Sequence, residues 1–312
     1  MPKVANVTRG LLAVPLLVAV TMATTPATSA FTQAPDRRPP DRTPPTAPVV
    51  DGPSETEDTA PVFTFSSRDR RTPAAKIRFE CSIDAAALHR CSREYSESLV
   101  FGKHVLRVRA VDRAGNRSRI TSFAFVVVGV WDAADDMLIA PNHANPNPDR
   151  YDNATWSYMW SSVRVHNPAQ YRLFTHYTVV DAFREQWDVG DVQATPFPPR
   201  PLVGLDRPGG RIIMAPYPEQ FAVLAWKSPV SGTVDLEGSV ASSDPCSHGM
   251  DWTLDQGATS FLHGTLGGGQ GQTFNGSLTV ASGESLYFVL DPGPDDICDT
   301  AVVELTIRTS VL

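Results

Sequence analysis

Aromatic side chains form the clearest candidate binding surface in this sequence. Trp156, Tyr158 and Trp160 stand at every second position. Side chains two residues apart on a strand point to the same side, so a strand here would place three rings on one face. Such a row could stack on pyranose rings, whose axial hydrogens suit a π-face. We therefore predict a glycan-binding platform made of Trp156, Tyr158, Trp160 and Trp187, the last in a segment expected to be exposed.

The same rings have a structural alternative. One face of every strand in a sandwich is buried, and indoles and phenols are ordinary core residues. This core role is the more common one for such a row. Trp226 and Trp252 lie in strands with apolar periodicity and are predicted to be core residues.

Two acidic segments surround Cys246 and Cys298. A disulfide between these cysteines would bring the segments together, and their carboxylates would repel one another unless a cation intervened. Hard cations such as Ca²⁺ prefer clustered oxygen donors. The alternative is a solvated acidic loop, in which salt screens most of the repulsion. No cofactor is expected apart from a candidate structural calcium ion, with ligands Asp299, Asp296 and Asp244.

Known catalytic motifs are absent from the sequence. It contains no G-x-S-x-G, no H-E-x-x-H, no phosphate-binding loop and no G-x-G-x-x-G after a strand. A triad or carboxylate pair that assembles only in space is invisible in one sequence. The enzymatic alternative is a glycan hydrolase or lyase that uses neighbouring residues around a predicted strand, namely His166, His176, Tyr177 and Asp181. We expect a protein without enzymatic activity.

Residues 1–30 have the layout of a secretory signal peptide. Basic Lys3 and Arg9 precede an apolar stretch over residues 11–23, and small residues end the segment before Phe31. The apolar stretch is shorter than the roughly 20 residues that span a bilayer. Residues 31–48 are rich in proline and predict a stiff linker. No later segment is long and apolar enough to cross a membrane, so we expect a secreted or cell-surface protein without a transmembrane segment in the mature chain.

The charge pattern gives no indication of a nucleic-acid partner. The formal net charge is −7, charged residues make up 20% of the chain, and basic residues form no dominant cluster.

Four cysteines in an exported chain favour disulfides. Four cysteines permit three pairings, and spacing alone does not choose among them. Because two cysteines fall in each module defined below, we predict Cys81–Cys91 and Cys246–Cys298. The chain has no C-x-x-C pair, which argues against a zinc site.

The first module, residues 49–129, shows period-two alternation. Phe79, Cys81 and Ile83 alternate with polar residues, and Leu106 and Val108 do the same. Short alternating runs separated by turn residues predict an antiparallel sandwich.

This module resembles a bacterial Ig-like repeat found in secreted actinobacterial proteins. The resemblance rests on the two cysteines and on residues 107–116, which read R-V-R-A-V-D-R-A-G-N. It implies a spacer or adhesive unit and no catalytic residues. Asp112, Asn116 and Asp84 could serve as calcium ligands, but we favour a turn that Asp112 and Asn116 shape together with Gly115.

The second module, residues 130–312, also alternates. Leu286, Phe288 and Leu290 are spaced by two, as are Val303 and Leu305. The loops are rich in glycine, so this half predicts a larger jelly-roll-like sandwich. Residues 196–218 contain seven prolines, and we expect a long irregular crossing there. The predicted fold is all-β, with an N-terminal Ig-like sandwich followed by the larger sandwich.

The second module resembles an uncharacterised bacterial jelly-roll domain that is similar to carbohydrate-binding modules. The resemblance rests on an N-P-N stretch at residue 145, the W-S-Y run at residue 156 and a W-K-S-P strand at residue 226. Residues 148–155 interrupt the first two motifs. The resemblance implies glycan binding only as an analogy of fold.

These observations lead to one expected function and two alternatives. We expect a secreted, non-catalytic protein that binds an extracellular or cell-wall polysaccharide. The first alternative is a structural or adhesive protein that binds a surface protein or whole cells, and the second is a polysaccharide-degrading enzyme.

Overall fold

The computed structural model describes residues 39–139, 143–190, 201–293 and 298–310. Of these described residues 53% lie in strands and 5% in helices, so the structure is nearly all β, which confirms the predicted fold class. The predicted signal peptide, residues 1–30, and residues 31–38 of the predicted linker lie outside the described residues. In the described part of the chain, no helix has the length and apolar character that a membrane crossing requires.

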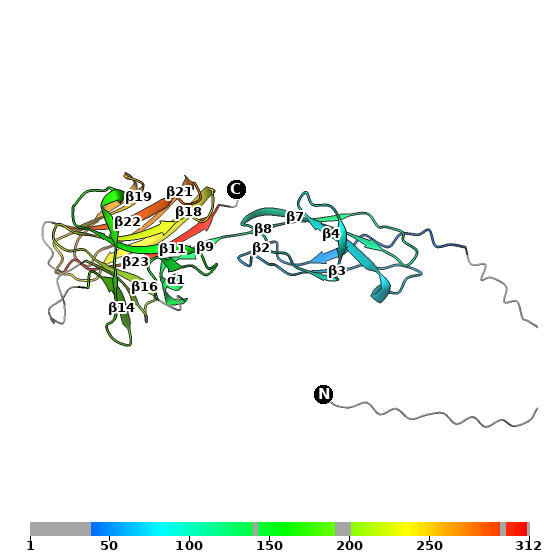
Figure 1. Cartoon of the computed structure of the whole chain (residues 1–312), viewed down its shortest axis with the longest axis horizontal. Helices are drawn as coiled ribbons and strands as arrows, with labels where there is room; N and C mark the ends of the chain where they lie inside the picture. Colours follow the sequence, from blue (N-terminus) through cyan, green and yellow to red (C-terminus); the bar gives the residue numbers. More distant parts are fainter. Residues whose placement is uncertain (1–38, 140–142, 191–200, 294–297, 311–312) are drawn as a thin grey trace, which may run out of the picture. The chain divides into compact units, whose positions relative to one another are not determined.

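Residues 49–127 form a sandwich of two sheets (Figure 1). The smaller sheet has the order β1-β3-β6 and consists of β1 (Val49–Asp51), β3 (Phe63–Ser66) and β6 (Glu94–Tyr95). The larger sheet has the order β2-β8-β7-β4-β5 and consists of β2 (Glu55–Thr56), β8 (Thr121–Val127), β7 (Gly102–Val111), β4 (Arg78–Ile83) and β5 (His89–Cys91). One 3-10 turn, η1 (Ala74–Lys76), precedes β4.

The predicted alternation builds the core of this sandwich. Phe79 and Cys81 of β4 are buried, and Leu106 of β7 has no exposed area. Cys81 is bonded to Cys91 on the neighbouring strand, which confirms the predicted disulfide.

Asp112 and Asn116 shape the turn that follows β7. The backbone N–H of Asn116 donates to Oδ1 of Asp112 at 2.8 Å, and its Nδ2 donates to Oδ2 at 2.7 Å. Gly115 has a φ of +93°, which glycine adopts without steric cost. The turn interpretation is therefore confirmed. Asp84 is engaged elsewhere, since Oδ1 accepts the N–H of Val105 at 2.9 Å.

Residues 130–309 form a larger sandwich, whose sheets share no strand with those of residues 49–127 among the described residues. The boundary that we predict at residue 129 stays a prediction. The seven-stranded sheet contains the path β10-β11-β17-β22-β19-β20, with β12 paired to β11. Its strands are β10 (Asn147–Pro148), β11 (Ala154–Ser161), β12 (Tyr171–Leu173), β17 (Phe221–Lys227), β19 (Met250–Gln256), β20 (Thr259–Leu266) and β22 (Ser285–Pro292).

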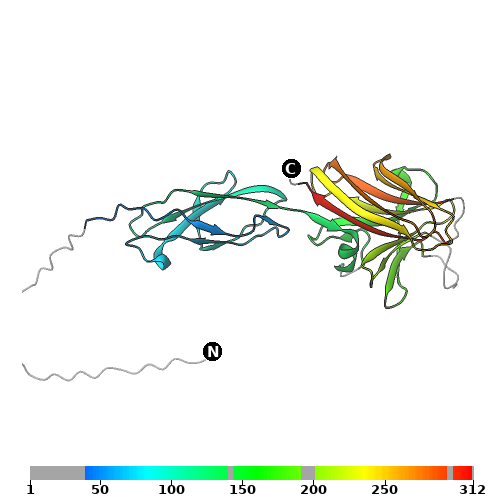
Figure 2. The ribbon, with the colours of Figure 1, turned by 180° about the vertical axis from the view of Figure 1, so that it is seen from behind.

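The eight-stranded sheet contains the path β13-β14-β15-β16-β23-β18-β21, with β9 paired to β23. Figure 2 shows β18 in yellow beside β23 in red, and the two strands pair in antiparallel register. Its strands are β9 (Val130–Asp132), β13 (His176–Val179), β14 (Arg184–Asp188), β15 (Leu202–Asp206), β16 (Arg211–Ala215), β18 (Gly232–Ser242), β21 (Gly271–Val280) and β23 (Ala301–Thr309). A short helix, α1 (Ala133–Ile139), follows β9, and a 3-10 turn, η2 (Pro168–Gln170), precedes β12.

The inner faces of these two sheets enclose a core of aromatic and aliphatic residues. Trp226 and Trp252 belong to it, with 1% and 3% of their surface exposed, as predicted. Cys246 is bonded to Cys298, which confirms the second predicted disulfide.

The prediction of an irregular crossing over residues 196–218 is wrong for the part that the structure describes. β15 and β16 form an antiparallel hairpin in which Leu202 pairs with Ala215. Pro201 precedes the first strand, Pro208 lies in the turn and Pro216 follows the second strand. The prolines thus occupy positions where no sheet hydrogen bond is needed, so their density did not prevent strand pairing. Residues 196–200 lie outside the described residues.

Candidate functional site

The predicted aromatic platform is largely interior. Trp156 and Tyr158 have no exposed area, and Trp187 is 7% exposed. These side chains project from the inner faces of β11 and β14 into the core, so the expectation of an exposed, flat platform is corrected. Trp160 is the partly exposed member, and the guanidinium of Arg172 lies 5.9 Å from its ring centroid.

Three polar side chains meet beside these rings at the edge of the eight-stranded sheet. The hydroxyl of Tyr177 donates to Oε2 of Glu185 at 2.7 Å, and Nη2 of Arg207 forms an ion pair with the same oxygen. Tyr177 lies on β13, Glu185 on β14 and Arg207 directly after β15. In the antiparallel register of β13 and β14, Tyr177 is opposite Trp187 and Val179 is opposite Glu185. The side chains of these two pairs therefore lie on the same face of the sheet.

The rings of this region form a connected set. Tyr158 and Trp187 stack with centroids 6.2 Å apart and an interplanar angle of 18°. Tyr177 contacts Trp187 at 5.3 Å, and His143 stacks on Tyr177 at 4.2 Å. We call Tyr158, Tyr177, Glu185, Trp187, Arg207 and His143 together the Glu185 cluster.

Asn145 fixes the loop before β10 against β11. Its Nδ2 donates to the carbonyl oxygen of Tyr158 at 2.7 Å and to that of Phe174 at 2.9 Å. Its Oδ1 accepts the N–H of Tyr158 at 3.0 Å. This side chain therefore holds the segment after His143 beside the strand that carries Tyr158.

Two buried polar atoms in the cluster have no hydrogen-bond partner among the described residues. One is Oε1 of Glu185, a residue that is 1% exposed, and the other is the hydroxyl of Tyr158. Buried polar groups are nearly always hydrogen-bonded, so each such atom requires a reason. A ligand hydroxyl or an amide could supply the missing partner.

The electrostatics keep both phenols of the cluster neutral. Burial, with further contributions from the charges of Asp136 and Glu185, raises the pKa of Tyr158 well above its usual value. Burial and the hydrogen bond to Glu185 raise the pKa of Tyr177 strongly. The hydrogen bond to Glu185 also raises the pKa of Arg207. Neutral phenols can donate and accept hydrogen bonds but are poor nucleophiles or bases near neutral pH.

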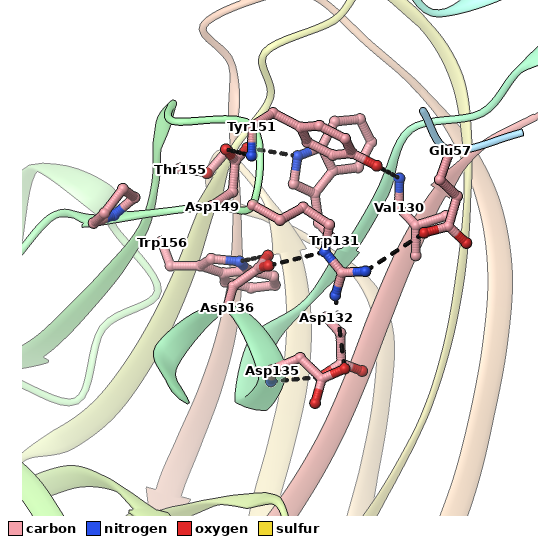
Figure 3. Close-up of polar contacts among 12 residues, drawn as sticks. Glu57, Val130, Trp131, Asp132, Asp135, Asp136, Asp149, Tyr151, Thr155 and Trp156 are labelled. Atoms are coloured by element: carbon pink, nitrogen blue, oxygen red, sulfur yellow. Dashed lines mark hydrogen bonds and ion pairs between the residues drawn. The ribbon is translucent and has the colours of Figure 1, made fainter. Parts of the chain in front are cut away.

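A second buried polar network lies beneath β11 (Figure 3). Nε1 of Trp156 donates to Oδ2 of Asp136 at 2.9 Å, and Nε of Arg150 donates to Oδ1 at 3.2 Å. Nε1 of Trp131 donates to Oδ2 of Asp149 at 2.8 Å. Burial raises the pKa of Asp136 to about 6. This network accounts for the interior position of Trp156, whose N–H is committed to a carboxylate of α1.

The four residues of the enzymatic alternative have separate partners. His166 Nδ1 lies 2.7 Å from Oδ2 of Asp255 on β19, whereas His176 Nδ1 lies 3.0 Å from Oδ1 of Asp188 on β14. Tyr177 belongs to the Glu185 cluster. Asp181 is exposed and accepts the N–H of Phe183 at 2.7 Å. His166 thus contacts the seven-stranded sheet, whereas His176 belongs to the eight-stranded sheet. The four residues therefore do not form one site.

The calcium prediction remains untested. Oδ1 of Asp299 accepts the hydroxyl of Ser247 at 2.7 Å, Asp244 is partly exposed, and Asp296 lies outside the described residues. Within the ranges that the structure describes, a different group of carboxylates could hold a metal ion. One carboxylate oxygen from each of Asp41, Asp69 and Asp112 lies within 4.8 Å of the other two.

The comparisons with known proteins identify no family. No protein-family model matches the chain, and no curated protein matches it. Among solved structures, a PKD domain of an M14-like peptidase from a Thermoplasmatales archaeon is 20% identical and has a TM-score of 0.23. The match covers 27% of this chain and 96% of the PKD domain chain.

Two further solved structures are carbohydrate-binding modules. One, from Clostridium perfringens ZmpB in complex with GlcNAc, is 10% identical with a TM-score of 0.28; it covers 84% of this chain, which spans 48% of that one. The other, described as a promiscuous module of the β-sandwich superfamily, is 10% identical with a TM-score of 0.26, and covers 87% of this chain and 94% of that one. At TM-scores of 0.23 to 0.28, these likenesses carry no conclusion about the fold or the function of this chain.

Sequence reasoning found Tyr158 and Trp187 but missed Glu185 and Arg207. Period-two spacing does place Glu185 on the same face as Trp187, which is a usable signal. The pairing of Arg207 with Glu185 spans 22 residues and depends on the β14–β15 register, so no local pattern reveals it.

Proposed function

We propose that this chain is an exported, non-catalytic protein that binds an extracellular polysaccharide at the Glu185 cluster. One observation carries the proposal: the buried carboxylate of Glu185 lies beside stacked rings, with Oε2 bonded to Tyr177 and Arg207 and Oε1 without a hydrogen-bond partner among the described residues. An acceptor left without a partner in the interior lowers stability, and a ligand donor would relieve that cost.

Sugars fit this combination of groups. Their ring faces contact aromatic side chains, and their hydroxyls donate to carboxylates and accept from phenols. Tyr177, His143 and Arg207 are partly or largely exposed, so the cluster reaches solvent through these three side chains. Ligand sites commonly combine apolar walls with a few oriented polar groups in this way.

Export is supported by two disulfides, which persist in oxidising compartments. It is also supported by the signal-peptide layout of residues 1–30. The absence of activity is supported by the neutral phenols of the cluster and by the separate positions of His166 and His176.

A glycan array probed with the full mature protein tests the proposal, followed by isothermal titration with the best glycan. Tyr177→Phe and Arg207→Ala each remove a hydrogen bond to the Glu185 carboxylate and should weaken binding by about tenfold or more. Tyr287→Phe and Arg308→Ala are matched controls on other strands and should bind normally.

Two outcomes contradict the proposal. If no glycan is retained but the protein binds whole cells or a surface protein, the adhesive alternative is favoured. If a glycan is retained equally by wild type and by both cluster variants, the site lies elsewhere.

A further inference from the structure

Oε1 of Glu185, which has no hydrogen-bond partner in the part of the chain that the structure describes, also constrains the charge of the ligand. An ionised carboxylate has only acceptor sites, so Oε1 can be satisfied only by a donor. The negative charge is already balanced, because Oε2 forms an ion pair with Arg207. The nearby carboxylate of Asp136 is balanced in the same way by Arg150, whose Nε lies 3.2 Å from Oδ1.

A charged ligand group would disturb this balance. A ligand carboxylate would meet a buried acceptor of its own sign, and a ligand ammonium would add a second cation to a carboxylate that Arg207 already neutralises. Burying an unbalanced charge is costly, whereas an uncharged donor brings no such cost. A hydroxyl can moreover donate to Glu185 and accept from Tyr158, whose own hydroxyl has no partner among the described residues.

We propose that the Glu185 cluster selects neutral sugars by receiving an uncharged hydroxyl at Oε1 of Glu185, and that it excludes uronic acids at this position. This inference rests on the proposed function and adds the chemical class of the ligand. It makes Glu185 the specificity-determining residue and Tyr158 its partner in holding the hydroxyl.

Paired oligosaccharides that differ only at C6 test the inference. Cellohexaose, mannohexaose and galactohexaose are compared with their C6-oxidised counterparts by titration against the full mature protein. For the pair that the protein recognises, the neutral sugar should bind at least tenfold more tightly than the uronate.

Glu185→Gln provides a sharper test, because the amide has one oxygen and one NH₂ group. Tyr177 and Arg207 both donate toward Oε2, so they orient the amide oxygen to that side. The NH₂ group then takes the place of Oε1, and the free position changes from an acceptor to a donor. Affinity for the neutral sugar should fall at least tenfold, and affinity for the uronate should rise. Glu304→Gln, on the exposed face of β23, is the matched control and should change neither affinity.

The outcomes separate this inference from the proposed function. If wild type binds the uronate as tightly as the neutral sugar and Arg207→Ala weakens both, the site is correct and the charge selection is wrong. If wild type binds no sugar of either class, the proposed function itself fails. Should Glu185→Gln not fold, as judged by circular dichroism, the wild-type comparison of neutral and oxidised sugars alone decides the inference.

Discussion

The indole N–H of Trp156 donates to Oδ2 of Asp136 across 2.9 Å, at a place where neither side chain has any exposed area. Burial raises the pKa of this carboxyl to about 6, although the bonds from Trp156 and Arg150 act in the opposite direction. The carboxyl therefore holds its proton more tightly in the folded protein than in the unfolded chain, where the pKa is 3.8.

This shift predicts a pH dependence of stability. The contribution of Asp136 to the free energy of unfolding should increase as the pH falls from above 6 to below 3.8, by up to about 3 kcal/mol. Urea unfolding at several pH values between 4 and 7, for wild type and Asp136→Asn, isolates this contribution, because other carboxyls affect both proteins. Parallel curves for the two proteins would contradict the prediction.

His166 and Asp255 predict a pH dependence of the same sign, but in a higher pH range. The hydrogen bond to Asp255 raises the pKa of His166. Burial alone would raise the pKa of Asp255, but hydrogen bonds from His166, Ser260 and Thr253 outweigh it and hold the pKa below its usual value. The stability from His166 is fully present below pH 6.5 and is lost as the pH rises through its raised folded pKa.

The contact ties residues 162–170 to the outer face of the seven-stranded sheet, where Phe221 and Val289 are buried. Raising the pH from 6 to 9 should therefore speed amide exchange in these residues, after correction for intrinsic rates. His166→Gln should remove this pH dependence, whereas His263→Gln, an exposed histidine of β20, should retain it. Equal pH profiles for wild type and His166→Gln would refute the assignment.

Gly204 packs closely against β14 behind the Glu185 cluster, so we predict that a larger residue at this position destabilises the protein. An added Cβ would lie 2.5 Å from the carbonyl oxygen of Glu185 and 3.0 Å from Cβ of Gln186. Gly204→Ala should therefore displace β14 and cost about 1–3 kcal/mol, with weaker glycan binding as a second effect. Thermal unfolding measures the first effect, and Gly271→Ala is the control, since its Cβ would come no nearer than 3.2 Å to a neighbour. An unchanged melting temperature for Gly204→Ala would show that β14 shifts without cost.

The two disulfides should differ in their contribution to stability. Cys246 and Cys298 are 52 residues apart, whereas Cys81 and Cys91 are 10 apart. Loop-closure entropy gives about 4 kcal/mol for the longer loop and about 3 kcal/mol for the shorter one. Calorimetry of the two double Cys→Ser variants compares them directly. A larger loss in the Cys81/Cys91 variant would contradict the entropic account.

Local alternation was sufficient to predict the fold class. Phe79, Cys81 and Leu106 are buried as their period-two spacing indicates, because a strand presents alternate side chains to the core. Proline density over residues 201–218 was misleading, because Pro201, Pro208 and Pro216 mark the ends and the turn of a hairpin rather than an irregular segment.

The candidate site was less predictable than the fold. Spacing grouped Trp156 with Tyr158 correctly on one face but could not tell whether that face is covered by a second sheet. The carboxylate at the centre of the cluster depends on Tyr177 of β13 and on Arg207 in the turn after β15. Such contacts follow from strand order and register, which a single sequence does not specify.

Tyr177 lies on β13, and among the described residues this strand pairs with β14 on one side only. A terminal strand of a sheet opens at lower free energy than strands such as β23, which are paired on both sides. A sugar that bridges Tyr177 and Glu185 would have to hold this hairpin closed. Part of the binding free energy would then go into keeping β13 paired with β14. Slower amide exchange along β13 would therefore report ligand occupancy.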